Sequence, residues 1–92
     1  MAYTYSDANG HLSPGPSING LRELKALIVE QRGWKHPALS QLLEHGHTNM
    51  LPALSAECRY LIVKTDNYDI QSTLTHLASL CLRADEMIVL EQ

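Results

Sequence analysis

Apolar residues recur every three or four positions along much of the chain, which is the spacing of one face of an α-helix. The strongest repeat falls within residues 66–90, where the intervals alternate between four and three. Its members are Ile70, Leu74, Leu77, Cys81, Ala84 and Ile88. This spacing is a heptad seam of nearly three repeats. We therefore expect one long helix in this segment, beginning at the turn formed by Asp66 and Asn67.

A first, shorter helix is expected over residues 18–32. Ser17 precedes it and can accept hydrogen bonds from its free backbone amides. Gly33 follows the last periodic residue, where a helix often ends in a left-handed conformation. The apolar positions of this helix are Leu21, Leu24, Leu27 and Ile28.

Two further helices are expected between these segments. One spans residues 37–45, because a proline suits the first helical position and Gly46 follows its end. The next helix begins after Thr48 or Asn49, either of which can cap it. Its apolar positions are Leu51, Leu54, Cys58 and Leu61.

The first sixteen residues are expected to form a flexible arm. Turn-forming residues interrupt them at positions 9–10 and 13–16. Residues 2–6 alternate around two tyrosines, which would also suit a short edge strand. We favour disorder, because chain ends without anchoring contacts usually fray. On this view the arm can be deleted with little loss of stability.

The pattern therefore predicts a mainly α fold, with a compact bundle of about four helices over residues 17–92 behind the flexible arm 1–16. The alternative is an α+β fold, because residues 58–65 and 86–91 contain β-branched runs that suit buried strands. Those strands would flank a crossover helix and pair in parallel. We favour the bundle, because two parallel strands make a poor sheet and the heptad seam is unbroken.

Composition narrows the classes of function. The chain has 92 residues, of which 45% are hydrophobic, and a formal net charge of −3. Nucleic-acid-binding domains usually carry a clear positive excess, so we do not expect a nucleic-acid partner. The sequence shows no signal peptide and no apolar stretch of the length that spans a bilayer. With only two cysteines, both in apolar patterns, we expect free buried thiols and a cytoplasmic protein.

We expect no metal, no cofactor and no catalytic residue. Residue types that bind zinc are present, but they lack the paired spacings of zinc sites. They are His36, His45, His47, His76, Cys58 and Cys81. The glycines are isolated, so no phosphate-binding loop is formed. Ser55 and Ser79 lack the flanking glycines of a nucleophile turn. The protein is therefore not expected to be an enzyme.

Residues 37–64 resemble a helix-turn-helix in outline, and a DNA-binding transcriptional regulator is the alternative function. A recognition helix reaches base edges with polar or basic side chains. The second helix of this segment is instead largely apolar, and its only basic residues are Arg59 and Lys64. A separate basic stripe follows the first helix, and we assign it to partner binding: Arg22, Lys25, Arg32 and Lys35.

The helix within residues 66–90 carries more apolar residues than its seam requires. Leu80 and Val89, with Leu82, are expected on its outer flank, where one chain offers no further helix. A row of apolar residues on one helix usually marks an interface, most simply with a second copy of the chain. We therefore expect a small intracellular protein–protein interaction module, which regulates, inhibits or adapts another protein by surface contact and can form a homodimer.

Overall fold

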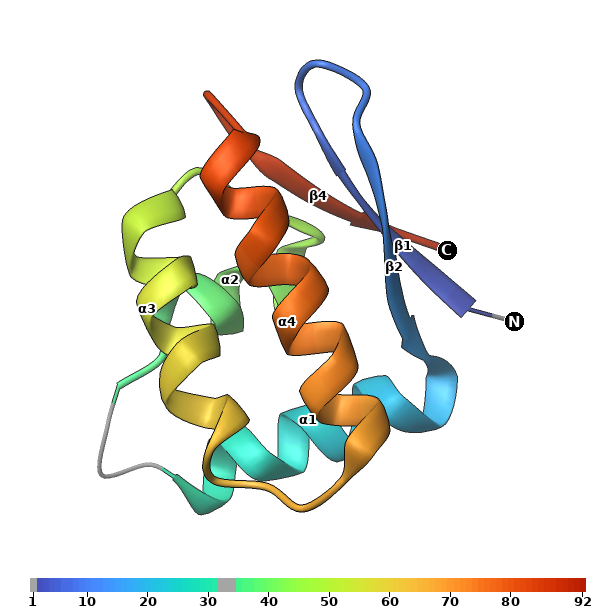
Figure 1. Cartoon of the computed structure of the whole chain (residues 1–92), viewed down its shortest axis with the longest axis vertical. Coiled ribbons are helices and arrows are strands. Elements are labelled where there is room, and N and C mark those ends of the chain that lie inside the picture. The colour runs from blue at the N-terminus through green and yellow to red at the C-terminus, as the bar shows by residue number, and fades with distance from the viewer. Residues whose placement is uncertain (1, 32–34) are drawn as a thin grey trace.

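The computed structural model describes residues 2–31 and 35–92, and it shows an α+β fold (Figure 1). The helices are α1 (Ile18–Glu30), α2 (Pro37–His45), α3 (Leu51–Ile62) and α4 (Tyr68–Arg83). The strands are β1 (Ala2–Asp7), β2 (Leu12–Ser17), β3 (His47–Thr48) and β4 (Ile88–Glu91). These strands form one antiparallel sheet in the order β2-β1-β4-β3. The prediction of a mainly α helical bundle is therefore wrong.

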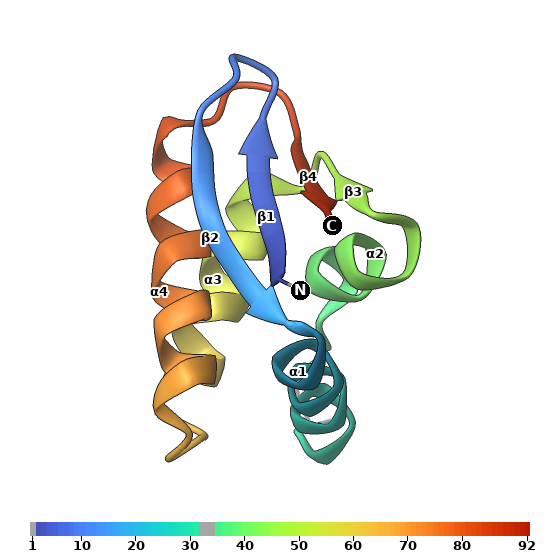
Figure 2. The same cartoon turned by 90° about the vertical axis from the view of Figure 1, so that its right-hand side faces the viewer.

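The N-terminal segment is a β-hairpin and not a flexible arm. β1 lies inside the sheet, hydrogen-bonded to β2 on one side and to β4 on the other (Figure 2). Asp7 closes the hairpin turn, because its Oδ1 accepts hydrogen bonds from the backbone N–H groups of Asn9 (3.0 Å) and His11 (2.8 Å). Desolvation would raise the pKa of Asp7, but these bonds and the His11 ring outweigh it and lower the pKa. The alternation around Tyr3 and Tyr5 was the correct signal for this strand.

The α+β alternative is correct at one of its two predicted strands. Residues 58–65 form no strand, because α3 continues to Ile62 and a turn follows. β4 does form within residues 86–91, but it pairs with β1 in the antiparallel sense, with Tyr5 opposite Leu90. The long helix predicted to run through Ile88 ends earlier, where Ala84 adopts an extended conformation. The strand that completes the sheet therefore comes from the other end of the chain.

A β-bulge shapes the strand that packs beside α4. Between the pairs Ala2–Ser17 and Thr4–Pro14, two residues of β2 lie opposite one residue of β1. Gly15 is one of the two, and a Cβ atom there would lie 2.7 Å from the carbonyl oxygen of Tyr3. Such a distance requires the backbone to move, so only glycine fits this position.

Replacing Gly15 by alanine is therefore expected to lower the free energy of unfolding by about 1–3 kcal/mol, as overpacking in a fixed environment does. Chemical denaturation followed by circular dichroism measures this loss. Leu12→Ala, on the same strand but with a side chain 69% exposed, is the control and should change stability little. Equal stability of Gly15→Ala and wild type would contradict the bulge.

The core lies between the sheet and the helices, with α3 packed against α4 and α2. Its fully buried large apolar side chains are Tyr5, Leu24, Leu39, Leu42, Leu54, Leu61, Ile70, Leu74, Leu77, Leu80 and Ile88. Glu57 on α3 is buried as well, and its carboxylate accepts hydrogen bonds from the backbone N–H groups of Ala38 (3.1 Å) and Leu39 (2.9 Å). It thereby caps the start of α2, where helix amides lack partners. Within the described ranges, no helix has the length and hydropathy needed to cross a membrane.

Candidate functional site

The exposed side of α4 is the candidate site. Asn67 caps the helix, because its Oδ1 accepts hydrogen bonds from the N–H groups of Asp69 (2.9 Å) and Ile70 (3.3 Å). The predicted seam then faces the core, and the opposite side faces solvent along the front of the molecule in Figure 1. We call this opposite side the outer face of α4. It consists of Tyr68, Asp69, Ser72, Thr75, His76, Ser79, Leu82 and Arg83.

Large apolar side chains stand at both ends of the outer face. Tyr68 is 79% exposed and Leu82 is 81% exposed, the two highest values among the large apolar residues that the structure describes. Between them lie three small hydroxyl residues, spaced by four, three, four and three positions from end to end: Ser72, Thr75 and Ser79. This is the heptad spacing that brings one stripe of a helix against another helix.

Each end of the outer face also carries one charge. Asp69 lies in the first turn of α4 and Arg83 in the last, and both are exposed. They are the only formally charged side chains of this helix when histidine is neutral. Their signs match the helix macrodipole, which favours an anion at the first turn and a cation at the last. The face is therefore polarised along its length.

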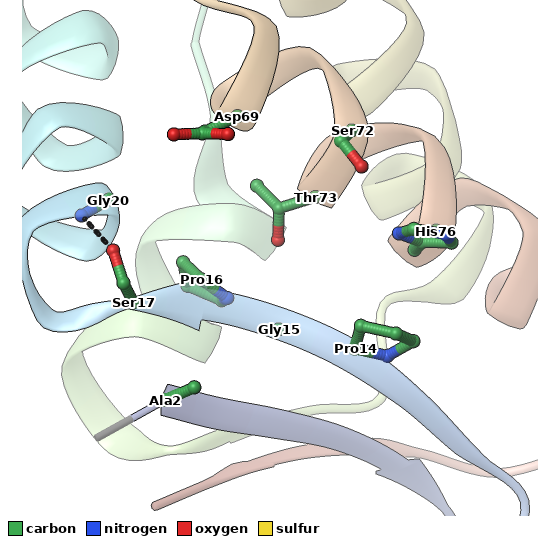
Figure 3. A pocket seen from close by; sticks show the side chains of 10 residues that line it. All are labelled: Ala2, Pro14, Gly15, Pro16, Ser17, Gly20, Asp69, Ser72, Thr73 and His76. Carbon is green, nitrogen blue, oxygen red and sulfur yellow. Dashed lines mark hydrogen bonds between the residues drawn. The ribbon is translucent and has the colours of Figure 1, made fainter.

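A pocket of about 340 Å³ lies between α4 and β2 on one side of the outer face (Figure 3). From α4 it is lined by Asp69, Ser72, Thr73 and His76. From the other side it is lined by Ala2, Pro14, Gly15, Pro16, Ser17 and Gly20. The α4 residues are spaced by three, one and three positions, so they occupy one side of the helix. The pocket thus has a polar wall of helical side chains and a second wall in which two prolines meet the N-terminus of α1.

The base of this pocket is fixed by a buried hydrogen bond. The hydroxyl groups of Thr73 and Tyr5 lie 3.1 Å apart, joining α4 to β1 beneath the outer face. Burial raises the pKa of Tyr5, and the bond with Thr73 offsets only part of this rise. At the pocket's end, Ser17 Oγ accepts a hydrogen bond of 3.0 Å from the N–H of Gly20. The hydroxyl groups of Thr73 and Ser17 are thus held in place at the pocket wall.

A second hollow, of about 380 Å³, lies on the side of the outer face toward α3. It is lined by Ile62, Tyr68, Gln71, Ser72, Thr75 and His76. Ser72 and His76 therefore belong to both hollows, which flank the helix. The Gln71 side chain is held by a hydrogen bond of 2.7 Å to the carbonyl oxygen of Thr65. A third hollow at the end of α4 contains Leu82. The outer face is thus a ridge with depressions beside it.

Asp69, Ser72 and His76 are the residue types of a hydrolytic triad, but their arrangement is not one. A triad needs the base hydrogen-bonded to the nucleophile and oriented by the acid. No hydrogen bond joins these three side chains in the described part of the chain. Their proximity follows from helical spacing alone. The groups can donate and accept hydrogen bonds to a bound molecule, so the geometry suits binding.

The structure separates the predicted basic stripe from this site. Arg22 and Lys25 are exposed on α1, and Lys35 is exposed before α2, whereas Arg32 and the predicted stop at Gly33 lie outside the described residues. Lys25 lines a hollow between α1 and α2 together with exposed apolar Val29. The stripe therefore lies on a different element from the outer face of α4.

Leu80 and Val89 do not form the predicted outer row. Leu80 is 0% exposed and belongs to the core, so a partner cannot reach it. Val89 is half-buried on β4, opposite Ser6, because α4 ends before it. Of the three residues considered for this flank, only Leu82 is on the exposed side. Tyr68 was missed although the sequence carried a signal for it, since Tyr68 and Leu82 bracket a heptad stripe of hydroxyl residues.

The buried thiols offer no reactive group. Cys58 and Cys81 are both free and buried. Burial raises the pKa of Cys81 to about 11, and burial also raises that of Cys58. Neither thiol therefore ionises near neutral pH, where a nucleophilic or metal-binding cysteine must. Within residues 2–31 and 35–92, no group of three or more His, Cys, Asp or Glu side chains is placed to hold a metal ion.

The two helices of the helix-turn-helix outline are α2 and α3, which pack against each other. Short strand β3 separates α2 from α3, and α3 buries most of its apolar residues against its neighbours. Its exposed residues within the helix are Pro52, Ala56 and Arg59. Arg59 donates a hydrogen bond of 3.3 Å to the Ser55 hydroxyl. This exposed strip has one basic side chain, whereas phosphate contacts need several.

Comparison with known proteins gives no relative for this chain. No protein-family model, no curated protein and no solved structure matches it.

Proposed function

We propose that the chain is a small cytoplasmic protein-binding module that uses the outer face of α4 as its contact surface. It would regulate, inhibit or adapt its partner by occupying a surface, without chemistry of its own. The free buried cysteines support a cytoplasmic location, because cytoplasmic proteins keep their thiols reduced.

One observation carries the proposal: Tyr68 and Leu82 are both about four-fifths exposed on the same face of one helix. Apolar side chains exposed singly are common, but two anchors on one face can enter pockets of a partner together. The hollows beside them would accept side chains in return. Small residues between the anchors leave room for a partner backbone to approach.

Neither edge of the sheet is well suited to pairing with a strand of a partner, which favours the outer face of α4 as the contact surface. An incoming strand needs free N–H and C=O groups along an edge. The β2 edge carries Pro14 and Pro16, which have no N–H group, and the β3 edge is only two residues long. Prolines and very short strands both protect a sheet edge from pairing with another chain. A partner is therefore expected to meet a helix face.

Site-specific crosslinking in the native host tests the surface. A photo-reactive amino acid replaces Tyr68 or Leu82 in separate variants, and Val29 in a matched control. Val29 is also an exposed aliphatic residue, but it lies on α1. Positions 68 and 82 are expected to yield the same crosslinked protein, identified by mass spectrometry, and position 29 should not yield it.

Adding Ser79→Arg to the crosslinking variants supplies the second control, because a large charged side chain at the centre of the face blocks close approach. The crosslinked product should then disappear while the circular dichroism spectrum stays unchanged. The proposal is wrong if positions 68 and 82 yield different products, or none, or if position 29 yields the same one.

A further inference from the structure

We infer that the partner of the outer face is a second copy of this chain, with the two α4 helices packed antiparallel about a two-fold axis. The inference rests on the proposed function, of which it names the partner. In such a pair the axis is perpendicular to both helices and passes between them. Residues equally far from the axis in opposite directions then face each other.

The apolar ends of the outer face match under this symmetry. Thr75 is seven residues from Tyr68 and seven from Leu82. An axis at the level of Thr75 therefore places Tyr68 of one chain opposite Leu82 of the other, at both ends of the contact. Residues 68 and 82 are separated by about 21 Å at 1.5 Å per residue, so the two apolar contacts bracket four turns of helix.

The charges match under the same symmetry. His76 is seven residues from Asp69 and seven from Arg83, so the centre differs from that of the apolar pairs by one residue. The two charges lie on the same flank of the outer face, and this axis keeps that flank on the same side in both chains. Asp69 of each chain therefore meets Arg83 of the other. A parallel two-fold pair would instead place this flank on opposite sides in the two chains, so Asp69 of one chain would not meet Arg83 of the other.

The centre of the face allows the helices to approach closely. Ser72, Thr75 and Ser79 are small, and helix axes separated by small side chains lie near the lower end of the usual range of about 8–10 Å. Thr75 Oγ1 already donates a hydrogen bond of 2.7 Å to the carbonyl oxygen of Gln71. Its hydroxyl proton therefore needs no partner when the contact forms.

Charge reversal tests the geometry. Asp69→Arg and Arg83→Asp each place like charges at both ends of an antiparallel homodimer. Each variant alone is expected to show a dimer dissociation constant raised about tenfold over wild type at low salt. Mixed in equal amounts, however, the two variants regain both opposite-charge pairs. Sedimentation equilibrium of the mixture should then give a dissociation constant within about threefold of wild type.

Because Asp69 and Arg83 are both exposed, neither variant should unfold, and thermal melting by circular dichroism verifies that each remains folded. The double variant Asp69→Arg/Arg83→Asp should also associate like wild type, because it exchanges the charges and keeps them complementary. The inference is overturned if the mixture associates no better than the single variants, or if wild type stays monomeric at about 300 µM.

The crosslinking result separates this inference from the proposed function. A product containing two copies of the chain supports the proposed contact surface and the dimer. A product containing a different protein, formed from positions 68 and 82 but not from 29, supports the proposed surface and overturns the dimer.

Discussion

A chain that lacks residues 1–16 is expected to lose cooperative folding altogether. The deletion removes β1, which pairs with both β2 and β4, and most of β2 with it. It also removes Tyr5, a fully buried side chain whose loss opens the core beside Thr73. Large-to-small changes at single core positions already cost about 2–5 kcal/mol, which is a large part of the roughly 5–15 kcal/mol that stabilises a small domain.

Thermal melting by circular dichroism measures this outcome, and no sigmoidal transition is expected for the shortened chain. Tyr5→Phe in the full chain is the control, because it keeps the ring and removes only the bond to Thr73. It should fold and lose about 1 kcal/mol. A shortened chain that melts within a few degrees of the full chain would restore the view of a dispensable arm.

Glu57→Ala is expected to lower the free energy of unfolding by about 2–4 kcal/mol, because two buried amides lose their acceptor together. The amides belong to Ala38 and Leu39, both of which are fully buried at the start of α2. Glu57→Gln keeps one carbonyl oxygen and should lose only about 1–2 kcal/mol. Urea denaturation at neutral pH measures both. Equal stabilities of Glu57→Ala and wild type would exclude this cap.

The same carboxyl group gives a pH dependence of defined sign. Burial raises the pKa of Glu57, and the N–H groups of Leu39 and Ala38, with His36 nearby, lower it only in part. The folded chain therefore holds this proton more tightly than the unfolded chain does. The contribution of Glu57 is largest below the unfolded pKa of about 4.3 and declines as pH rises through the folded value. The stability difference between wild type and Glu57→Gln should follow that decline, and a difference that grows with pH would contradict it.

Local signals in the sequence predicted several helix ends. Ser17 accepts the hydrogen bond expected of a cap, and Gly46 ends α2 in the left-handed conformation with φ of 81°. Asn67 caps α4 as expected. The third helix was less well predicted, because its cap is Met50 and not Thr48 or Asn49. Caps and stops depend on a few neighbouring residues, which is why the sequence reveals them.

The sheet depends on contacts between distant residues, and local periodicity does not reveal these. Ile88 continues the spacing of the helical seam and is fully buried, yet it reaches the core from a strand. A helix and a strand would each bury Ile88, so the apolar pattern at this position does not distinguish between them. β1 and β4 join the two ends of the chain, and Tyr5 pairs with Leu90. Short apolar runs are where helix and strand are hardest to separate.

The sequence pointed to the same helix as the candidate site, but to different residues. An outer face on the last helix was expected, but the choice of Leu80 followed apolar character alone. The structure buries Leu80 and exposes Leu82, two positions along the same helix. Two positions correspond to a rotation of about 200°, which reverses the direction of the side chain. A periodicity that includes polar residues identifies Tyr68 and Leu82 as the ends of one stripe.

Light scattering of the wild-type chain over about 10–300 µM tests most directly whether the outer face of α4 joins two copies of the chain. The measured mass is expected to rise from that of one chain toward that of two. Leu82→Glu should keep the mass of one chain throughout, whereas Leu12→Glu, with its charge on an exposed residue of β2, should behave as wild type. A wild-type chain that remains monomeric, or a Leu82→Glu variant that associates as wild type does, would contradict the dimer through this face.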